Sequence, residues 1–479
     1  MATGDSSDSS FIQPENSASL PKINLLTMFR LGLFQMGLGM MSVLIFGVFN
    51  RILIKELGVP ATLASIILAI TLFVAPARVW FGQMSDTKKL WGYHRTGYVL
   101  IGAASLAITA FIALQVMWQV GNSLKLVGWT GQTYAWTALL AFIFGIYGLA
   151  VSASSTPFTT LLVDVSDEDN RSKLVGIDWS MLITGTIIGA IIIGTLLKKL
   201  TINAPIEEIQ TQLNQVFLIA TPLVFGLALA STWGVEKKYS RYASRSRLVN
   251  QEEKITLGRA WRILTASRQT QLFFTFLMAL TLGLFMQDPV LEPYGGEVFN
   301  MEIGATATLN AYFGTGTLLG LSTSGFVIMP RLGKRNATKL GCTLVAVSLL
   351  GIILSGFTHN PTMLKMALLF FGLFSGIATT GAITLMLDLT AAETAGTFIG
   401  AWGLSQALAR GVATVSGGAF LDIGKQIFTN NVVLAYGLVF LLQGMAMILA
   451  IWLLTRVDVQ EFRTNAKDAI ATVMETELD

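Results

Sequence analysis

The chain has 479 residues, of which 53% are hydrophobic and 13% are charged. Soluble domains carry about 25% charged residues, so this composition and a mean hydropathy of +0.64 exclude an ordinary soluble globular protein and indicate an integral membrane protein. The formal net charge of +4 is explained by basic residues that face the anionic lipids of one membrane leaflet. It therefore requires no nucleic-acid partner.

The N-terminal segment differs in composition from the rest of the chain. Residues 1–20 are rich in Ser and Asp and contain no Lys or Arg. They lack the basic and apolar regions of a signal peptide, and a polar composition of this kind is typical of disorder. We therefore predict a disordered cytoplasmic tail at residues 1–22.

Apolar stretches of about 20 residues, the length that a helix needs to cross the hydrocarbon core, recur along the remaining chain. They predict twelve transmembrane helices, near residues 28–50, 60–84, 96–118, 133–156, 174–198, 214–234, 268–288, 305–329, 335–357, 363–387, 396–420 and 431–455. An even number places both termini on one side. Most of the 32 Lys and Arg residues fall on that side, whereas the opposite loops carry few, among them Arg51 and Lys55. By the positive-inside rule, both termini are cytoplasmic.

A basic segment separates two sets of six predicted spans. In residues 235–267, Lys and Arg outnumber Glu, and Trp261 lies among the basic residues. This pattern fits an amphipathic segment on the membrane surface or a solvated linker. The predicted fold is all-α, with an N-terminal six-helix bundle at 23–234, a cytoplasmic linker at 235–267, a C-terminal six-helix bundle at 268–456 and a cytoplasmic tail at 457–479.

The loop after the second predicted span carries a recognisable pattern. Residues 82–86 read Gly-Gln-Met-Ser-Asp, and residues 92–95 read Gly-Tyr-His-Arg. The pattern resembles the GxxxD…GRR loop signature of the major facilitator superfamily. The resemblance implies that Gly82 permits close helix approach and that Asp86 and Arg95 belong to a charge network that stabilises one of two alternating states. In the second half Met329 stands where the Asp would be, which disfavours a symmetric pair of switches.

An acidic element occurs once in each half, between the fourth and fifth predicted spans. Asp164 precedes Gly176 by the same spacing as Asp388 precedes Gly400. In that alignment Asp169 corresponds to Glu393. Such an internal match is expected when two parallel six-helix repeats are related by an axis along the membrane normal.

The most informative stretch is Gln287-Asp-Pro-Val-Leu-Glu-Pro-Tyr-Gly-Gly296, which ends the seventh predicted span. Asp288 and Glu292 should face a cavity, a partner charge or water, because an ionised carboxylate in hydrocarbon is costly. Pro289 and Pro293 remove backbone donors and should end or distort the helix. A turn at the membrane exit is the plainer interpretation of the same residues.

Arg410 lies midway through the eleventh predicted span and must point inward. It could be the counter-charge to Asp288 or Glu292, a clamp for an acidic ligand group, or part of a purely structural buried pair. Four glutamines also lie in apolar spans, and each is expected to form an interhelical hydrogen bond rather than to bind the magnesium of a pigment: Gln35, Gln287, Gln406 and Gln443.

The stretch from Gln287 to Gly296 resembles the QD…LEPYGG signature of the bacteriochlorophyll delivery family (PucC/LhaA-like), a branch of the major facilitator superfamily. The resemblance implies a protein that assists the assembly of light-harvesting or photosystem complexes, with chlorophyll or bacteriochlorophyll as its ligand. Antenna or photosystem apoproteins and membrane lipids would be its partners, in an inner or thylakoid-type photosynthetic membrane. The ligand-binding or coupling residues would be Gln287, Asp288, Glu292, Tyr294 and Arg410.

No catalytic constellation is evident, since the two histidines lie in predicted loops on opposite sides and Cys342 is the one cysteine. An enzyme and a metal site in the protein itself are therefore not expected. The alternative function is a proton-coupled secondary transporter of another amphipathic or anionic solute. In that case Asp288 or Glu292 would titrate and Arg410 would bind the anion.

Overall fold

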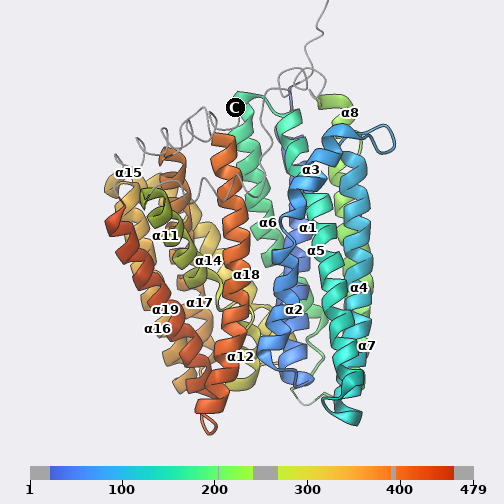
Figure 1. Cartoon of the computed structure of the whole chain (residues 1–479), viewed down its shortest axis with the longest axis vertical. Helices are drawn as coiled ribbons and strands as arrows, with labels where there is room; N and C mark the ends of the chain where they lie inside the picture. Colours follow the sequence, from blue (N-terminus) through green and yellow to red (C-terminus); the bar gives the residue numbers. More distant parts are fainter. Residues whose placement is uncertain (1–21, 203, 241–267, 390–394, 458–479) are drawn as a thin grey trace, which may run out of the picture.

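The computed structural model describes residues 22–202, 204–240, 268–389 and 395–457. Throughout these residues the regular secondary structure is helical, apart from an isolated bridge between Leu90 and Tyr93. The long helices run side by side along one axis of the molecule (Figure 1). This arrangement confirms the predicted all-α class.

The first part of the chain forms one nearly continuous helix followed by several others. Its elements are α1 (Leu25–Ser42), the π-helical segments η1 (Val43–Phe49) and η2 (Ile52–Glu56), α2 (Ala61–Phe73), α3 (Ala77–Thr87), α4 (Thr96–Val127), α5 (Gly131–Val165), α6 (Glu168–Leu196), α7 (Ile206–Thr232) and α8 (Val235–Tyr239). The described start of the predicted linker, residues 235–239, is therefore helical.

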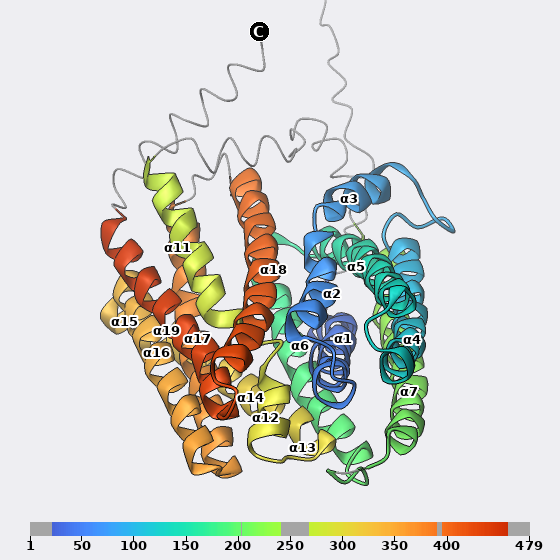
Figure 2. The same ribbon diagram turned by 60° about the horizontal axis from the view of Figure 1, so that its bottom comes forward.

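The second part contains more interruptions. Its elements are α11 (Arg268–Phe285), α12 (Leu291–Val298), α13 (Ile303–Ala307), α14 (Leu309–Thr323), the π-helical η3 (Ser324–Ile328), α15 (Met329–Leu332), α16 (Lys334–Thr358), α17 (Pro361–Leu389), α18 (Ala395–Ile427) and α19 (Val432–Arg456). We call the end of the molecule that carries α3, α8 and α15 the α3 end (Figure 1). The end that carries α12 and α13 is called the α12 end (Figures 1 and 2).

Within the described residues, nine helical stretches are long and apolar enough to cross a membrane, which makes the chain an integral membrane protein. They are Leu25–Glu56, Ala61–Thr87, Thr96–Val127, Gly131–Val165, Lys173–Leu196, Ile206–Tyr239, Lys334–Thr358, Pro361–Met386 and Val432–Arg456. The other three predicted spans coincide with α11, α14 and α18, which are helical without meeting that criterion. Helix α11 is interrupted after Phe285, and α18 contains Arg410.

Helices from distant parts of the sequence pack against one another. Helix α1 packs on α6 and α7, α4 on α5, α14 on α17, and α16 on α17 and α19. Two further pairs connect the first part of the chain to the second, namely α2 with α18 and α6 with α14 (Figure 2). Glycines allow several of these approaches: a Cβ at Gly189 of α6 would lie 2.8 Å from the Cα atom of Met40 in α1.

Candidate functional site

The signature segment is a broken helix. Helix α11 ends at Phe285, a turn follows, and α12 begins at Leu291. Asp288 lies in this turn, whereas Glu292 lies in the first turn of α12, where Pro293 is tolerated because the first-turn amides have no intrahelical acceptor. The predicted disruption of the helix is confirmed. As a consequence, the two carboxylates have different partners.

Asp288 pairs with Arg410, which α18 contributes. Arg410 Nη2 donates to Asp288 Oδ2 at 2.9 Å. The arginine side chain is 39% exposed and that of the aspartate 19%. The Arg410 guanidinium also lies over the ring of Phe285, 4.4 Å from its centroid. The structure thus selects Asp288, rather than Glu292, as the partner of Arg410, and leaves the pair partly open.

Glu292 is buried between α14 and η1. Asn310 Nδ2 donates to Glu292 Oε1 at 2.6 Å. Glu292 Oε2 has no hydrogen-bond partner among the described residues. A Cβ at Gly47 would collide with Glu292 Oε1, so glycine is required in η1 where the carboxyl group packs against it.

Three side chains that follow η1 hold the signature segment by its backbone. Arg51 donates to the carbonyl oxygens of Met301 at 2.8 Å and Glu302 at 2.9 Å. Lys55 Nζ donates to the carbonyl oxygen of Gly296 at 3.0 Å. Asn50 donates to the carbonyl oxygen of Pro289, and Arg51 also donates to the hydroxyl of Thr306. We call Asn50, Arg51, Lys55 and these acceptors the Arg51 clasp.

Gly296 makes room for the Arg51 clasp. A Cβ at this position would lie 2.9 Å from Cδ of Lys55 and 3.1 Å from Cζ of Arg51. The Gly-Gly at the end of the signature is thereby explained in part by close approach of two basic side chains. Residue 295 is also constrained, since a Cβ there would lie 2.8 Å from Cγ2 of Thr306.

The predicted loop position of Arg51 and Lys55 was wrong. The first helix continues to Glu56, and the Arg51 side chain is 1% exposed. The apolar run ends near residue 50, and for this reason hydropathy places the membrane boundary too early. A signal was present in the spacing, because Arg51 and Lys55 lie four residues apart and share one helix face.

Two other signature residues are parts of the packed interior. Gln443 of α19 donates to Gln287 Oε1 and, at 3.0 Å, to the carbonyl oxygen of Gly283. Tyr294 donates its hydroxyl to the carbonyl oxygen of Ile352 at 2.9 Å, and its ring packs edge-on against Phe440. These contacts anchor the signature segment to α16 and α19. Gln35 of α1 likewise donates to Asp178 of α6 at 2.9 Å. These bonds are the interhelical hydrogen bonds expected of Gln35, Gln287 and Gln443.

Asp422 of α18 caps the start of α2. Its carboxylate accepts hydrogen bonds from the backbone amides of Ala61 at 3.0 Å and Thr62 at 2.7 Å. These amides have no intrahelical acceptor, and a carboxylate at a helix N-terminus is favourable. Close to this cap, a Cβ at Gly418 would collide with the Ser65 hydroxyl and the Ala61 carbonyl oxygen.

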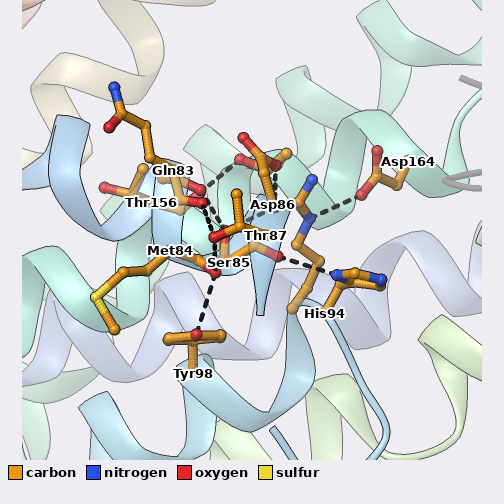
Figure 3. A network of polar contacts seen from close by, with 12 residues as sticks. Gln83, Met84, Ser85, Asp86, Thr87, His94, Tyr98, Thr156 and Asp164 are labelled. Atoms are coloured by element: carbon orange, nitrogen blue, oxygen red, sulfur yellow. Dashed lines mark hydrogen bonds and ion pairs between the residues drawn. The ribbon is translucent and has the colours of Figure 1, made fainter. Parts of the chain in front are cut away.

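A second group of charges lies at the α3 end (Figure 3). Arg95 contacts Asp86 Oδ1 at 2.6 Å and Asp164 Oδ2 at 2.9 Å, and it donates to Ser85 Oγ at 2.6 Å. Glu236 of α8 accepts from the backbone amide of Thr96 at 2.7 Å, in the first turn of α4. We call Ser85, Asp86, Arg95, Thr96, Asp164 and Glu236 the Arg95 network. It brings together Asp86, Arg95 and Asp164, which the sequence had placed in two separate motifs.

The remaining predicted site positions are Gly82, Asp169, Asp388 and Glu393. A Cβ at Gly82 would lie 3.6 Å from Cγ2 of Thr156, an ordinary distance, so the expected close approach is not found there. Helices α4 and α5 touch instead at Gly102, where a Cβ would lie 2.6 Å from the Ser154 nitrogen. The side chains of Asp169 and Asp388 and all of Glu393 lie outside the described residues.

The chain is similar to known proteins over most of its length. Residues 48–462 match the family model described as PUCC protein. Protein PucC from Rhodobacter capsulatus is 31% identical, over 90% of this chain and 92% of the relative. The "Bacteriochlorophyll synthase 44.5 kDa chain" of the same species is 29% identical, over 90% and 95% of the two chains.

The fold is also found in solved transporters. The crystal structure of the nucleoside transporter NupG superposes with a TM-score of 0.65 at 14% identity, covering 91% of this chain and 99% of the other. At this identity the likeness concerns the fold, which is of the major facilitator type. The match to the family model and the identity to PucC decide the relationship: the chain belongs to the PUCC protein family.

Proposed function

We propose that this protein assists the assembly of light-harvesting or photosystem complexes by handling chlorophyll or bacteriochlorophyll within the membrane. The observation that carries the proposal is the partly exposed Arg410–Asp288 pair, which the signature segment positions. Family relatives named for PucC and for a bacteriochlorophyll synthase chain support a pigment as the ligand. A charged pair with one open side suits a flat apolar molecule that has a few polar edge groups.

The proposal includes a membrane arrangement. Twelve spans form two six-helix bundles, at 23–234 and 268–456. Both termini are cytoplasmic, and the α3 end faces the cytoplasm of an inner or thylakoid-type photosynthetic membrane. The basic residues of the predicted cytoplasmic segments support this orientation. The protein acts on pigment as cargo without catalysing a reaction, and antenna or photosystem apoproteins receive it.

An absorption spectrum tests this function. The full-length protein is purified gently from a pigment-producing cell, next to the Arg410→Ala variant and the matched control Arg331→Ala, which removes an exposed arginine from α15. We expect stoichiometric chlorophyll-type bands in the wild type and the control, and their loss in Arg410→Ala. A folded but colourless wild type would contradict pigment handling.

A proton-coupled secondary transporter is the second candidate, and the buried Glu292 with an unpartnered oxygen favours it. In that case Glu292 would exchange a proton as a solute crosses the membrane. Proteoliposomes with a pH-sensitive dye inside test this candidate. A proton flux that depends on added amphipathic anion, and that disappears in Glu292→Gln, would support transport, whereas an absence of flux in a pigment-loaded protein would favour assembly.

A further inference from the structure

Asp178 carries a buried carboxyl group in the membrane-spanning part of α6. It lies in the apolar stretch Lys173–Leu196, and the residue is 4% exposed. Gln35 of α1 donates its amide nitrogen to Asp178 Oδ2 at 2.9 Å. The other oxygen, Oδ1, is buried and has no hydrogen-bond partner among the described residues. In the described part of the chain, a single neutral amide is therefore the polar partner of this carboxyl group.

The elements around Asp178 contribute no counter-charge within the described residues. Helix α6 packs mainly against α1, η1, α5, α13 and α14. The ionisable residues on these five elements are Arg30, Tyr134, Tyr147, Asp164 and Tyr312. Arg30 donates to the carbonyl oxygen of Ala230 in α7, and Asp164 pairs with Arg95. Tyrosines are uncharged at neutral pH, so none of these groups neutralises an ionised Asp178.

The basic residues of α6 itself also lie apart from Asp178. Arg171 lies two turns earlier, about 10 Å along the helix axis, and no described ion pair joins the two side chains. Lys173 is exposed and, at five residues from Asp178, lies on a different face of the helix. An ionised Asp178 would therefore be an isolated charge in the interior of the protein.

The contact of α1 with α6 around Gln35 and Asp178, which we call the α1–α6 seam, is tightly closed. A Cβ at Gly185 would collide with the carbonyl oxygen of Met36, one residue after Gln35. At Gly39, an added Cβ would likewise collide with a carbonyl oxygen of α6. Backbones this close leave no gap for water between the two helices. The seam thus excludes the solvent that an ionised carboxylate requires.

These surroundings favour the protonated form of Asp178. An unpaired carboxylate in a protein interior costs several kcal/mol, and a group in this position takes up a proton instead. A protonated carboxyl group has an O–H donor. The oxygen and nitrogen of the Gln35 amide exchange places when the amide turns over, so Gln35 can accept from the acid as well as donate to it.

Helix α6 also connects the seam to the second part of the chain, because it packs against α13 and α14. A Cβ at Gly314 of α14 would lie 2.9 Å from Cγ1 of Ile187, and a Cβ at Gly304 of α13 would lie 2.5 Å from the carbonyl oxygen of Gly194. Movement of the second part against the first therefore shifts α6. A shift that separates α6 from α1 admits water to Asp178.

We propose that Asp178 is a proton-binding site. It is a neutral acid while the α1–α6 seam is closed. When the seam opens, the proton passes from the carboxyl oxygen to water and leaves a carboxylate, so that proton release accompanies the movement of α6. The site is formed by other helices than the Arg410–Asp288 pair and Glu292. The inference goes beyond the proposed function, since it applies whichever cargo the protein handles.

Infrared difference spectra test the site. Full-length protein in lipid bilayers is measured at neutral pH, and the spectrum of Asp178→Asn is subtracted from that of the wild type. We expect the C=O stretching band of a protonated carboxylic acid in this difference. Asp86→Asn is the control and should remove no such band, because the Asp86 side chain is 48% exposed and pairs with Arg95.

Two results of this experiment would overturn the proposal. One is a difference spectrum with the bands of an ionised carboxylate. The other is failure of Asp178→Asn to fold, because the amide has the shape and the charge of the neutral acid. A count of protons gives an independent check: unfolding in detergent at neutral pH should release about one proton more per molecule from the wild type than from Asp178→Asn.

A wedge in the seam tests the release of the proton. Gly185→Ala places a methyl group against the Met36 carbonyl oxygen, so the acid band should weaken and carboxylate bands should grow. Gly176→Ala, on the same helix, is the matched control, since a Cβ added there would meet nothing within 4 Å. An unchanged acid band in folded Gly185→Ala would overturn the coupling. If that variant does not fold, Gly32→Ala decides in its place, because its Cβ would meet the flexible Met181 side chain at 2.6 Å.

Discussion

The Arg51 clasp and the Arg95 network are both built around a buried arginine, yet they connect different parts of the chain. In the Arg95 network, described contacts join Arg95 to Asp86 and Asp164, all from the first part of the chain. In the Arg51 clasp, Arg51 donates to carbonyl groups of residues 301 and 302, which lie about 250 positions later in the sequence.

This difference assigns the two arginines different roles. The Arg95 network holds α3, α4, α5 and α8 together at one end of the molecule. The Arg51 clasp and the Asp422 cap on α2 tie the first part of the chain to the second at the α12 end. Any movement that separates α2 from α18 must break the Asp422 cap.

The largest expected effect comes from Arg51→Met. This change removes the ion pair of Arg51 with Glu56 and leaves the carbonyl groups of Met301 and Glu302 without their donor, so it should lower the free energy of unfolding by about 3–5 kcal/mol. It should also loosen the α12 end. The reporter of this loosening is a cysteine introduced by Ser65→Cys, at a buried position beside Gly418. Its labelling by maleimide should be severalfold faster with Arg51→Met than without it.

The matched control for this prediction is Arg95→Met with the same reporter. It also removes a buried arginine, so a fall in the thermal unfolding midpoint is expected. Ser65→Cys should stay protected, because the described contacts of the Arg95 network all lie within the first part of the chain. The native Cys342 is buried and adds little background. Equal labelling in both variants would refute the distinction between the two regions.

A smaller effect is expected from Gly418→Ala. The added methyl group would collide with the Ala61 carbonyl oxygen, a backbone atom, and overpacking of this kind costs about 1–3 kcal/mol. Labelling of a cysteine at position 65 should rise here too. Gly226→Ala in α7 is the control, since a Cβ added there would meet nothing within 4 Å. Equal labelling of the two variants would mean that close packing of α2 against α18 does not protect position 65.

The smallest effect is expected from Asp86→Asn. The Asp86 side chain is 48% exposed, and an ion pair of this exposure contributes at most about 1 kcal/mol. Arg95 keeps its contact with the buried Asp164. Thermal unfolding in detergent should therefore change by a few degrees at most, and a collapse of stability would mean that Asp86 has a larger structural role than its exposure indicates.

Helix positions could be predicted from the sequence where apolar residues alone decide them. Hydropathy identified the stretches now seen as α4, α5, α16, α17 and α19, because each is a long apolar run. It failed at the end of the first helix, where the chain remains helical through Asn50, Arg51 and Lys55 although these side chains are polar. Their burial is stabilised by carbonyl groups from a distant segment, which no local pattern reveals.

The candidate site could be predicted in its components but not in its pairings. The carboxylates and prolines of the signature indicated a helix break with partnered charges, and Arg410 was the expected inward-facing cation. Whether Arg410 would meet Asp288 or Glu292 depended on the turn after Phe285, which directs the two carboxylates to different helices. Asn310 carried no sequence signal, since it is one of several small polar residues in the eighth predicted span.

The Asp422 cap has a consequence for the order of synthesis. Thr62 and Asp422 are separated by 360 positions, so at about 5–20 residues per second the ribosome adds the carboxylate roughly 20–70 s after the amide. During that interval the first turn of α2 has no partner from its own chain and relies on water at the membrane boundary. Helix α2 thus acquires its final N-terminal contact as one of the last steps in building the membrane domain.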